Sequence, residues 1–440
     1  MRKLAPFAAV FVIVTAFYGT TYSYRHITDT DLNSHQTRAL VLHGDINIGR
    51  YDFSRPKYAI HHGANQYSIY GVGVSLIGAP IYFFLAHFYL SDRIAQGVAA
   101  IPFVAGAIVA MLWLLLRLFG KKLAVAGTVV FAFGTTMWPL ASMAFYTHGP
   151  VALLQILGVC ALFSERERAP FWAGLAFAGA MFIRPTVFIF VVAVGIFYLL
   201  RGIGPAVKFG IGSFAPIAGI LIQNRWIWGS WLKSGYSFAG VGFHGNVQRA
   251  LFGLLFGWWR GLFVYSPILL LSVAGFILVV RKRRGYIEQR LLTLGIASIA
   301  TILFYARWTT WWGGLSQFGY RYLLDVVPVL IVLSVYAMPS VTRVRSIAIP
   351  AGVVSIMTMA AGSVYSLGAW DVVNFPKHFG QTSIGQAWTV ALDDPLPRII
   401  RFAGVLIASA AIWWVTPPRE DEDASRRFLK ERRGAPMLME

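Results

Sequence analysis

Long apolar stretches, each separated from the next by a short polar segment, run along almost the whole chain. An α-helix needs about 17 to 25 apolar residues to cross a bilayer, and most of these stretches reach or approach that length. Twelve of them can be placed, which predicts an all-α polytopic membrane protein with about twelve transmembrane helices. They cover approximately residues 4–18, 94–116, 123–145, 150–163, 172–183, 187–200, 207–222, 262–280, 291–305, 322–338, 347–367 and 400–415.

One further apolar stretch, residues 69–90, does not fit as a span. Three glycines and Pro80 interrupt it, and it is rich in aromatic rings, which suit the membrane interface. If it crossed the bilayer, the next span would leave Arg117 and Lys121 outside, although basic clusters favour the cytoplasmic side. We therefore expect residues 69–90 to lie at the outer face as a juxtamembrane or re-entrant helix.

This arrangement gives a simple organisation. The remaining basic clusters fall on the cytoplasmic side, and so do both termini. Residues 1–416 form one transmembrane domain, with a first outer loop at about residues 19–93. Residues 417–440 form a charged cytoplasmic tail, which we expect to be disordered because it contains few apolar residues.

Composition supports the membrane assignment. The chain is 57% hydrophobic and 13% charged, whereas an ordinary soluble domain is about 25% charged. Its formal net charge of +20 comes from short Lys and Arg clusters between apolar stretches. The charge is therefore a signal of membrane orientation and does not indicate a nucleic-acid partner.

The first outer loop holds two carboxylates close to the first span, Asp29 and Asp31. A carboxylate at the membrane surface could take the proton of a hydroxyl or amine acceptor. The pair could instead hold a divalent cation, and no other cofactor is indicated. The structural alternative is that one of these aspartates caps a helix that begins near Leu32.

Four further ionisable residues stand at outer ends of predicted spans. His148 begins one span and Arg184 lies between two, where it could bind phosphate or extend to the lipid headgroups. Arg321 and Asp325 are four residues apart, so on an α-helix they share a face and could pair with each other. A structural ion pair and a binding role both remain open for this couple.

No motif of a soluble enzyme competes with these residues: the chain has no P-loop, paired-cysteine metal motif or Gly-x-Ser-x-Gly. The order of several short segments resembles instead the membrane-embedded glycosyltransferases of the GT-C class, the superfamily of protein O-mannosyltransferases and aminoarabinose transferases. The segments are Asp29-Thr30, His43-Gly44, Tyr70-Gly71-Val72-Gly73, Trp138-Pro139, Tyr146-Thr147-His148-Gly149-Pro150, Arg184-Pro185-Thr186, Gly235-Tyr236, Gly261-Leu262 to Ser266-Pro267 and Gly313-Gly314 to Tyr320-Arg321-Tyr322.

The resemblance implies inverting transfer of a sugar from a polyprenyl-phosphate donor to an acceptor at the outer face of the cytoplasmic membrane. The acceptor would be a glycan, lipid or protein of the cell envelope. Asp29 matches the family's acidic position better than Asp31, so it is the expected base. Tyr70 stands where the family has lysine and prolines. The resemblance then assigns the donor phosphate to other basic residues: Arg184 or Lys57, assisted by Arg321 or His148.

A second class stays open. Twelve spans with both termini inside also describe a secondary transporter or a lipid flippase. A transporter is expected to place ionisable residues near the middle of the membrane, whereas a transferase places them at one face. The interiors of the predicted spans carry almost no charge, which favours the transferase. A noncatalytic scaffold is a third alternative that no residue excludes.

Overall fold

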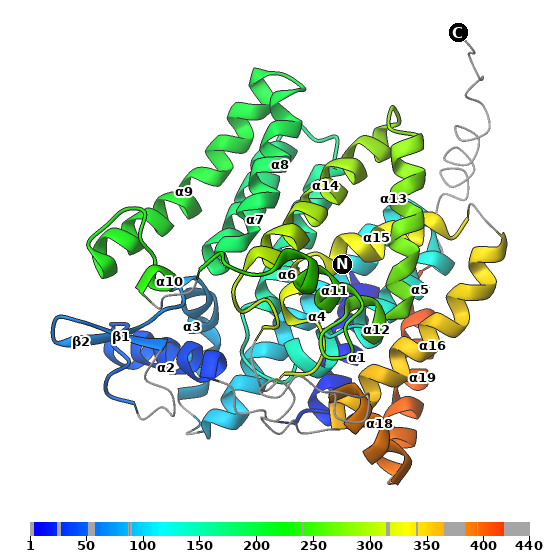
Figure 1. Cartoon of the computed structure of the whole chain (residues 1–440), viewed down its shortest axis with the longest axis horizontal. Helices are drawn as coiled ribbons and strands as arrows, with labels where there is room; N and C mark the ends of the chain where they lie inside the picture. Colours follow the sequence, from blue (N-terminus) through cyan, green and yellow to red (C-terminus); the bar gives the residue numbers. More distant parts are fainter. Residues whose placement is uncertain are drawn as a thin grey trace.

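The computed structural model is a helical bundle with one small sheet (Figure 1). It describes residues 4–23, 28–51, 58–86, 88, 90–238, 242–313, 317–339, 342–364, 383–393 and 395–417. The predicted polar tail therefore lies outside the described residues from position 418 on. The all-α prediction, with a helical loop after the first helix, is confirmed.

Each predicted span contains helical structure. The matching helices are α1 (Ala5–Thr20), α4 (Asp92–Phe119), α5 (Lys121–Phe133), α6 (His148–Leu162), α7 (Ala169–Ile183), α8 (Phe188–Leu199), α9 (Ile203–Trp228), α12 (Leu262–Tyr265) with α13 (Leu271–Arg281), α14 (Tyr286–Arg307), α15 (Val327–Ala337), α16 (Thr342–Val364) and α19 (Leu396–Val415). Proline stands at the first or second position of α1, α7, α15 and α19. Proline suits a helix start because its missing N–H would have no partner there.

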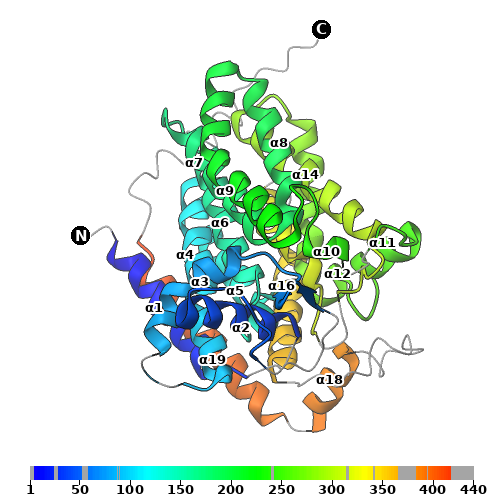
Figure 2. The same cartoon turned by 90° about the vertical axis from the view of Figure 1, so that its left-hand side faces the viewer.

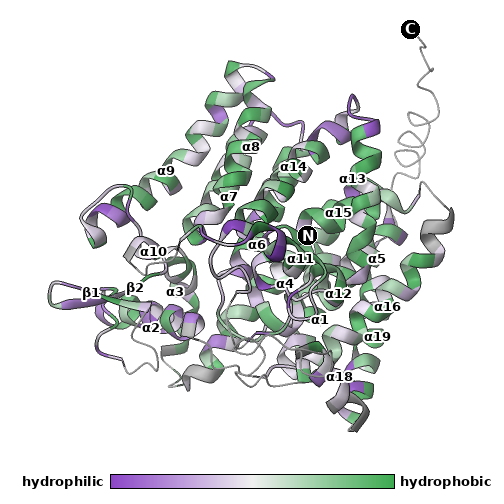
Figure 3. Cartoon of the chain, in the orientation of Figure 1, coloured by the Kyte–Doolittle hydropathy of each residue, from purple (hydrophilic) through white to green (hydrophobic). Residues whose placement is uncertain are grey.

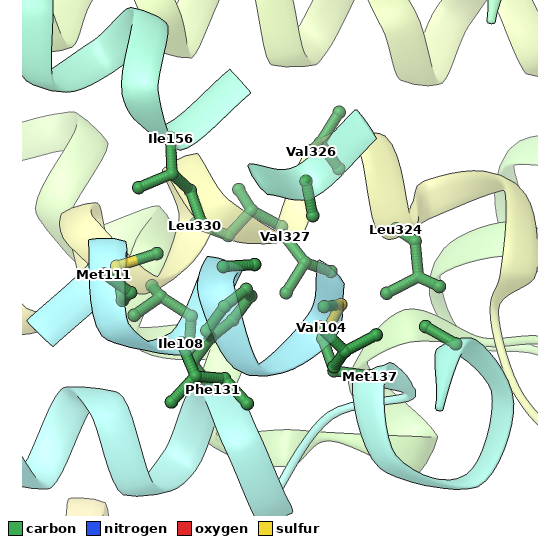
Figure 4. Packing of buried hydrophobic residues seen from close by; sticks show 14 of the residues in the cluster. Val104, Ile108, Met111, Phe131, Met137, Ile156, Leu324, Val326, Val327 and Leu330 are labelled. Atoms are coloured by element: carbon green, nitrogen blue, oxygen red, sulfur yellow. The ribbon is translucent and has the colours of Figure 1, made fainter. Parts of the chain in front are cut away.

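The centre of the bundle is α15. All its residues are buried, as expected for a helix that is apolar on every side. Val327 and Leu330 pack against Ile108 of α4, Phe131 of α5 and Ile156 of α6, as Figure 4 shows. Helix α9, in contrast, exposes most of its apolar side chains at the edge of the bundle.

The surface chemistry fits a bilayer. Within the described residues, α4, α9, α14, α16 and α19 contain apolar segments of 19 to 26 residues, long enough to cross a membrane, and other apolar helices are shorter. In Figure 3 the middles of α7, α8 and α14 are hydrophobic, and the hydrophilic stretches gather in the connections and near β1, β2 and α2. The exposed apolar surface therefore suits lipid contact.

Several predicted spans are broken, each next to proline or glycine. The stretch at residues 123–145 is α-helical only to Phe133, and after Gly134 it continues as a π-helical turn, Met137–Ala141. The stretch at 262–280 breaks at Ser266 before Pro267, where the 3₁₀ turn η4 (Pro267–Leu270) begins. The one at 322–338 begins with the 3₁₀ turn η5 (Arg321–Asp325). Irregular backbone at such depth requires burial within the protein, and the residues of both Met137–Ala141 and η5 are almost all buried.

The first outer loop forms a separate layer at one end of the bundle. It contains α2 (Thr28–His43), the antiparallel hairpin of β1 (Ala59–His62) and β2 (Asn65–Ser68), and α3 (Gly73–Ala86). Helices α2 and α3 pack side by side, below α7 and α9 in the view of Figure 2. The Gln223 side chain of α9 accepts a hydrogen bond from the Val72 amide, which ties this layer to the bundle. The short helices α10 (Gly235–Phe238) and α11 (Val247–Leu255) follow α9.

Candidate active site

A narrow polar pocket lies between this layer and the ends of the bundle helices. It joins segments that are far apart in the sequence: α2, the turn after β2, the chain before α6, the α7–α8 junction, α10 and η5. Its lining residues are Asp29, Asn33, Tyr70, Gly71, Tyr146, Thr147, Ile183, Arg184, Pro185, Tyr236 and Arg321.

Arg184 owes its position to the proline that follows it. A proline disfavours helical backbone angles at the residue before it. Helix α7 therefore ends at Ile183, and Arg184 is extended, with φ −141° and ψ 104°. Its side chain is buried and turns into the protein, where Nε donates to Asp325 Oδ2 at 2.7 Å and one terminal nitrogen donates to the Tyr305 hydroxyl at 2.7 Å. Arg184 therefore does not extend to the lipid headgroups.

Asp325, the partner of Arg184, is held from three sides. Its Oδ2 accepts hydrogen bonds from Arg184, from the Tyr305 hydroxyl at 2.9 Å and from the Thr186 hydroxyl at 3.1 Å. The side chain is only 2% exposed. A carboxylate this deeply buried stays charged only with such partners, so the Arg184–Asp325 pair is a fixed part of the site.

Arg321 starts η5, just after a sharp turn at Gly319. That glycine has φ +79°, and a Cβ there would lie 2.4 Å from Thr136, so only glycine fits. The buried guanidinium of Arg321 donates to the Gly313 carbonyl at 3.2 Å and forms a salt bridge with Asp29. It also lies 5.0 Å from the ring centre of Tyr146, within cation–π distance.

His148, at the start of α6, connects the two ion pairs. Its Nε2 accepts a hydrogen bond from Arg321 Nε at 3.3 Å, and its Nδ1 lies 3.5 Å from Asp325 Oδ1. Because Nε2 accepts, the ring proton must be on Nδ1, and the histidine is neutral. The five groups together, Asp29, Arg321, His148, Asp325 and Arg184, therefore carry no net charge.

Asp29 lines the pocket from the first turn of α2. Burial of Asp29 opposes ionisation, but the Arg321 guanidinium and the Tyr70 hydroxyl, which donates to the carboxylate, outweigh it and hold the pKa of Asp29 below its usual value. The same burial and the Asp29 charge raise the pKa of Tyr70 well above its usual value. Asp29 is therefore a carboxylate and Tyr70 a neutral hydrogen-bond donor at neutral pH.

Of the two remaining predicted residues, Asp31 is not among the residues that line the pocket, and Lys57 lies outside the described residues. Asp31 points to α4, where Gln96 donates to its Oδ1 at 3.0 Å. Both aspartates lie within the first turn of α2, which begins at Thr28, so neither caps a helix near Leu32. Among the described residues, no three His, Cys, Asp or Glu side chains gather as a metal site would require.

Some of the site was not visible in the sequence. The Arg321–Asp325 pair that helical spacing would allow does not form: η5 is a 3₁₀ turn, and Arg321 pairs with Asp29 while Asp325 pairs with Arg184. Tyr305, which is hydrogen-bonded to Arg184 and Asp325, stands at the end of an apolar stretch. Nothing in its sequence surroundings distinguished it from a tyrosine at the membrane interface. Tyr236 was noted in the sequence only within the Gly235-Tyr236 segment, without a role, yet it lies edge-on to Tyr70, with 6.0 Å between ring centres.

Comparison with known proteins supplies the fold type. The structure is similar to the crystal structure of ArnT from Cupriavidus metallidurans bound to undecaprenyl phosphate, with a TM-score of 0.54 and 13% sequence identity. The match covers 94% of this chain and 75% of ArnT. The chain therefore shares the fold of ArnT. No family model and no curated protein matches the sequence.

Proposed function

We propose that this protein is an inverting glycosyltransferase that moves a sugar from a polyprenyl-phosphate donor to an acceptor at the outer face of the cytoplasmic membrane. One observation carries the proposal: in a GT-C-like fold, a single carboxylate and two buried arginines, Asp29, Arg184 and Arg321, line one pocket at the end of the bundle. ArnT, the similar protein, was crystallised with undecaprenyl phosphate.

The arginines suit a phosphate. Arg184 and Arg321 both line the pocket, and guanidinium forks match phosphate oxygens in pairs. Their other bonds, to Asp325, His148 and the Gly313 carbonyl, hold them in place before a ligand arrives. Such preorganised charge stabilises the negative charge that develops on a departing phosphate.

Asp29 suits the base. In the proposed reaction its carboxylate takes the proton of the acceptor O–H or N–H, and the acceptor atom forms a bond to the anomeric carbon. The bond from that carbon to the phosphate oxygen breaks on the opposite side, and its electron pair leaves with the polyprenyl phosphate. The attack from the opposite side inverts the anomeric configuration. Asp31, bonded to Gln96, supports α2 and does not touch the acceptor.

The tyrosines suit a sugar. Tyr70, Tyr146 and Tyr236 contribute rings to the pocket wall, and aromatic faces with a polar edge contact the apolar face of a sugar while they donate hydrogen bonds. Tyr70 also stands where the family resemblance expects lysine. In this chain the phosphate charge must therefore be balanced by Arg184 and Arg321.

The transporter alternative is less well supported. A transporter requires ionisable groups near the bilayer midplane, whereas Asp29, Arg184 and Arg321 gather where helices end and an extramembrane layer begins. We therefore place the chemistry at one face of the membrane, which we propose is the periplasmic side, with both termini cytoplasmic.

The proposal is tested with purified protein in lipid nanodiscs. A panel of polyprenyl-phosphate hexoses and pentoses is incubated with envelope fractions, and free polyprenyl phosphate is measured by mass spectrometry. We expect one donor to be consumed and its sugar to appear on the acceptor with inverted configuration, as determined by NMR. Unchanged donors, together with protein-dependent movement of a donor across a proteoliposome membrane, would support the flippase instead.

A further inference from the structure

The charges of the pocket are already balanced without a ligand. Arg184 is paired with Asp325 at 2.7 Å, Arg321 is paired with Asp29, and His148 between them is neutral. A polyprenyl-phosphate sugar is a phosphodiester that brings one further negative charge. Because unpaired charge in a buried site is costly, one of the two carboxylates must give up its arginine when the phosphate binds.

The two carboxylates differ in how firmly they are held. Asp325 is 2% exposed and accepts three hydrogen bonds through one oxygen, from Arg184, Tyr305 and Thr186. Asp29 is 14% exposed, lies in the first turn of α2 and faces the open pocket. Asp29 is therefore the carboxylate that can leave by a side-chain rotation, without opening the packed core.

Arg321 stays in position when Asp29 leaves. Its Nε is bonded to His148 at 3.3 Å and one terminal nitrogen is bonded to the Gly313 carbonyl at 3.2 Å, so only the remaining terminal nitrogen depends on Asp29. That nitrogen then offers its N–H to a phosphate oxygen. The Asp29 carboxylate thus occupies the position that a phosphate oxygen would take on Arg321.

We propose that the donor phosphate and the Asp29 carboxylate compete for Arg321, so that donor binding releases Asp29 to act on the acceptor. This proposal rests on the glycosyltransferase function proposed above. A carboxylate bound to a guanidinium is a weak base, and its release makes it a stronger one. The Tyr70 hydroxyl, which also bonds Asp29, can keep one hydrogen bond to the released carboxylate. The base becomes available only after the donor is in place.

Binding of undecaprenyl phosphate alone tests the competition, because this probe requires no sugar and no turnover. Its affinity is measured by native mass spectrometry of the protein in nanodiscs. We expect Asp29→Asn to bind the probe at least tenfold more tightly than the parent, since the competitor for Arg321 is gone. Asp31→Asn is the matched control: it removes the same charge from the same helix, but Asp31 is bonded to Gln96 and not to Arg321. We expect the affinity of this variant for the probe to stay within twofold of the parent.

A double-variant cycle separates competition for Arg321 from simple charge repulsion. In an Arg321→Gln background, Asp29→Asn should increase affinity less than threefold, because there is no guanidinium to compete for. An equal gain in both backgrounds would overturn the competition, as would an affinity of Asp29→Asn that equals or falls below that of the parent. Failure of every variant to bind the probe would instead overturn the glycosyltransferase proposal itself, and the competition with it.

Discussion

The role of Arg184 can be separated from its structural contribution by changing it together with Asp325. Replacing Arg184 by alanine removes a phosphate contact and also leaves the buried Asp325 carboxylate without its cation. Breaking a buried ion pair from one side costs about 3 to 5 kcal/mol of stability. Losing one contact to the departing phosphate costs on the order of 2 to 4 kcal/mol of transition-state stabilisation, about two to three decades in rate.

The double variant Arg184→Met with Asp325→Asn removes both charges at once. The amide oxygen at position 325 can still accept from Tyr305 and Thr186, whose hydroxyls lie 2.9 and 3.1 Å from the present carboxylate oxygen. We therefore expect the double variant to regain much of the stability that Arg184→Ala loses, but none of the activity. Arg184→Lys should keep the charge and recover only part of the rate, because an ammonium lacks the guanidinium fork.

The assay combines two measurements on the same nanodisc preparations. The fraction that remains monodisperse after heating reports stability, and release of polyprenyl phosphate from the lipid-linked donor reports transfer. If the double variant is stable and transfers sugar at the parent rate, Arg184 is only structural and the proposed phosphate contact is wrong. The same conclusion follows if Arg184→Ala is well folded and fully active.

Three further predictions follow. Asp29→Asn should lower the transfer rate by roughly two to four decades, because an amide cannot take a proton, whereas Asp31→Asn should stay within a few-fold; full activity of both variants would remove α2 from the chemistry. Because the pKa of Asp29 in the donor-free protein lies below its usual 3.8, kcat/KM for the donor, which reports the free enzyme, should not fall between pH 7 and 5, and a loss centred in that range would identify another base. Single cysteines in a Cys160→Ala background should show Asn65→Cys, but not Lys122→Cys, reacting with an impermeant reagent in intact cells; the reverse labelling would invert the topology.

The fold could be predicted from the sequence where one physical requirement dominated. Apolar length located the helices of the bundle. The placement of residues 69–90 at the membrane surface, from their glycines, their proline and the basic cluster that follows the next span, stays a prediction. The hairpin of β1 and β2 was missed, because each strand has only four residues and such short strands carry little alternation.

Several residues of the pocket could be predicted from the sequence, but their pairing could not. A charge at the end of an apolar stretch signals function by its cost, and this placed Arg184, His148 and Arg321 at the outer ends of the predicted spans. The partners depend on tertiary structure: Asp29 and Arg321 are 292 positions apart in the sequence. The helical spacing of Arg321 and Asp325 suggested the wrong pair, because the segment winds as a 3₁₀ turn.

The most direct test of the account is a cryo-electron microscopy structure of the protein in nanodiscs with undecaprenyl phosphate. We predict density for the phosphate in the pocket of Asp29, Arg184 and Arg321, within hydrogen-bond distance of both guanidinium groups, and an Asp29 carboxylate turned away from Arg321. Phosphate density at another place in the fold, with the Asp29–Arg321 pair intact, would contradict both the site and the competition between the donor and its base.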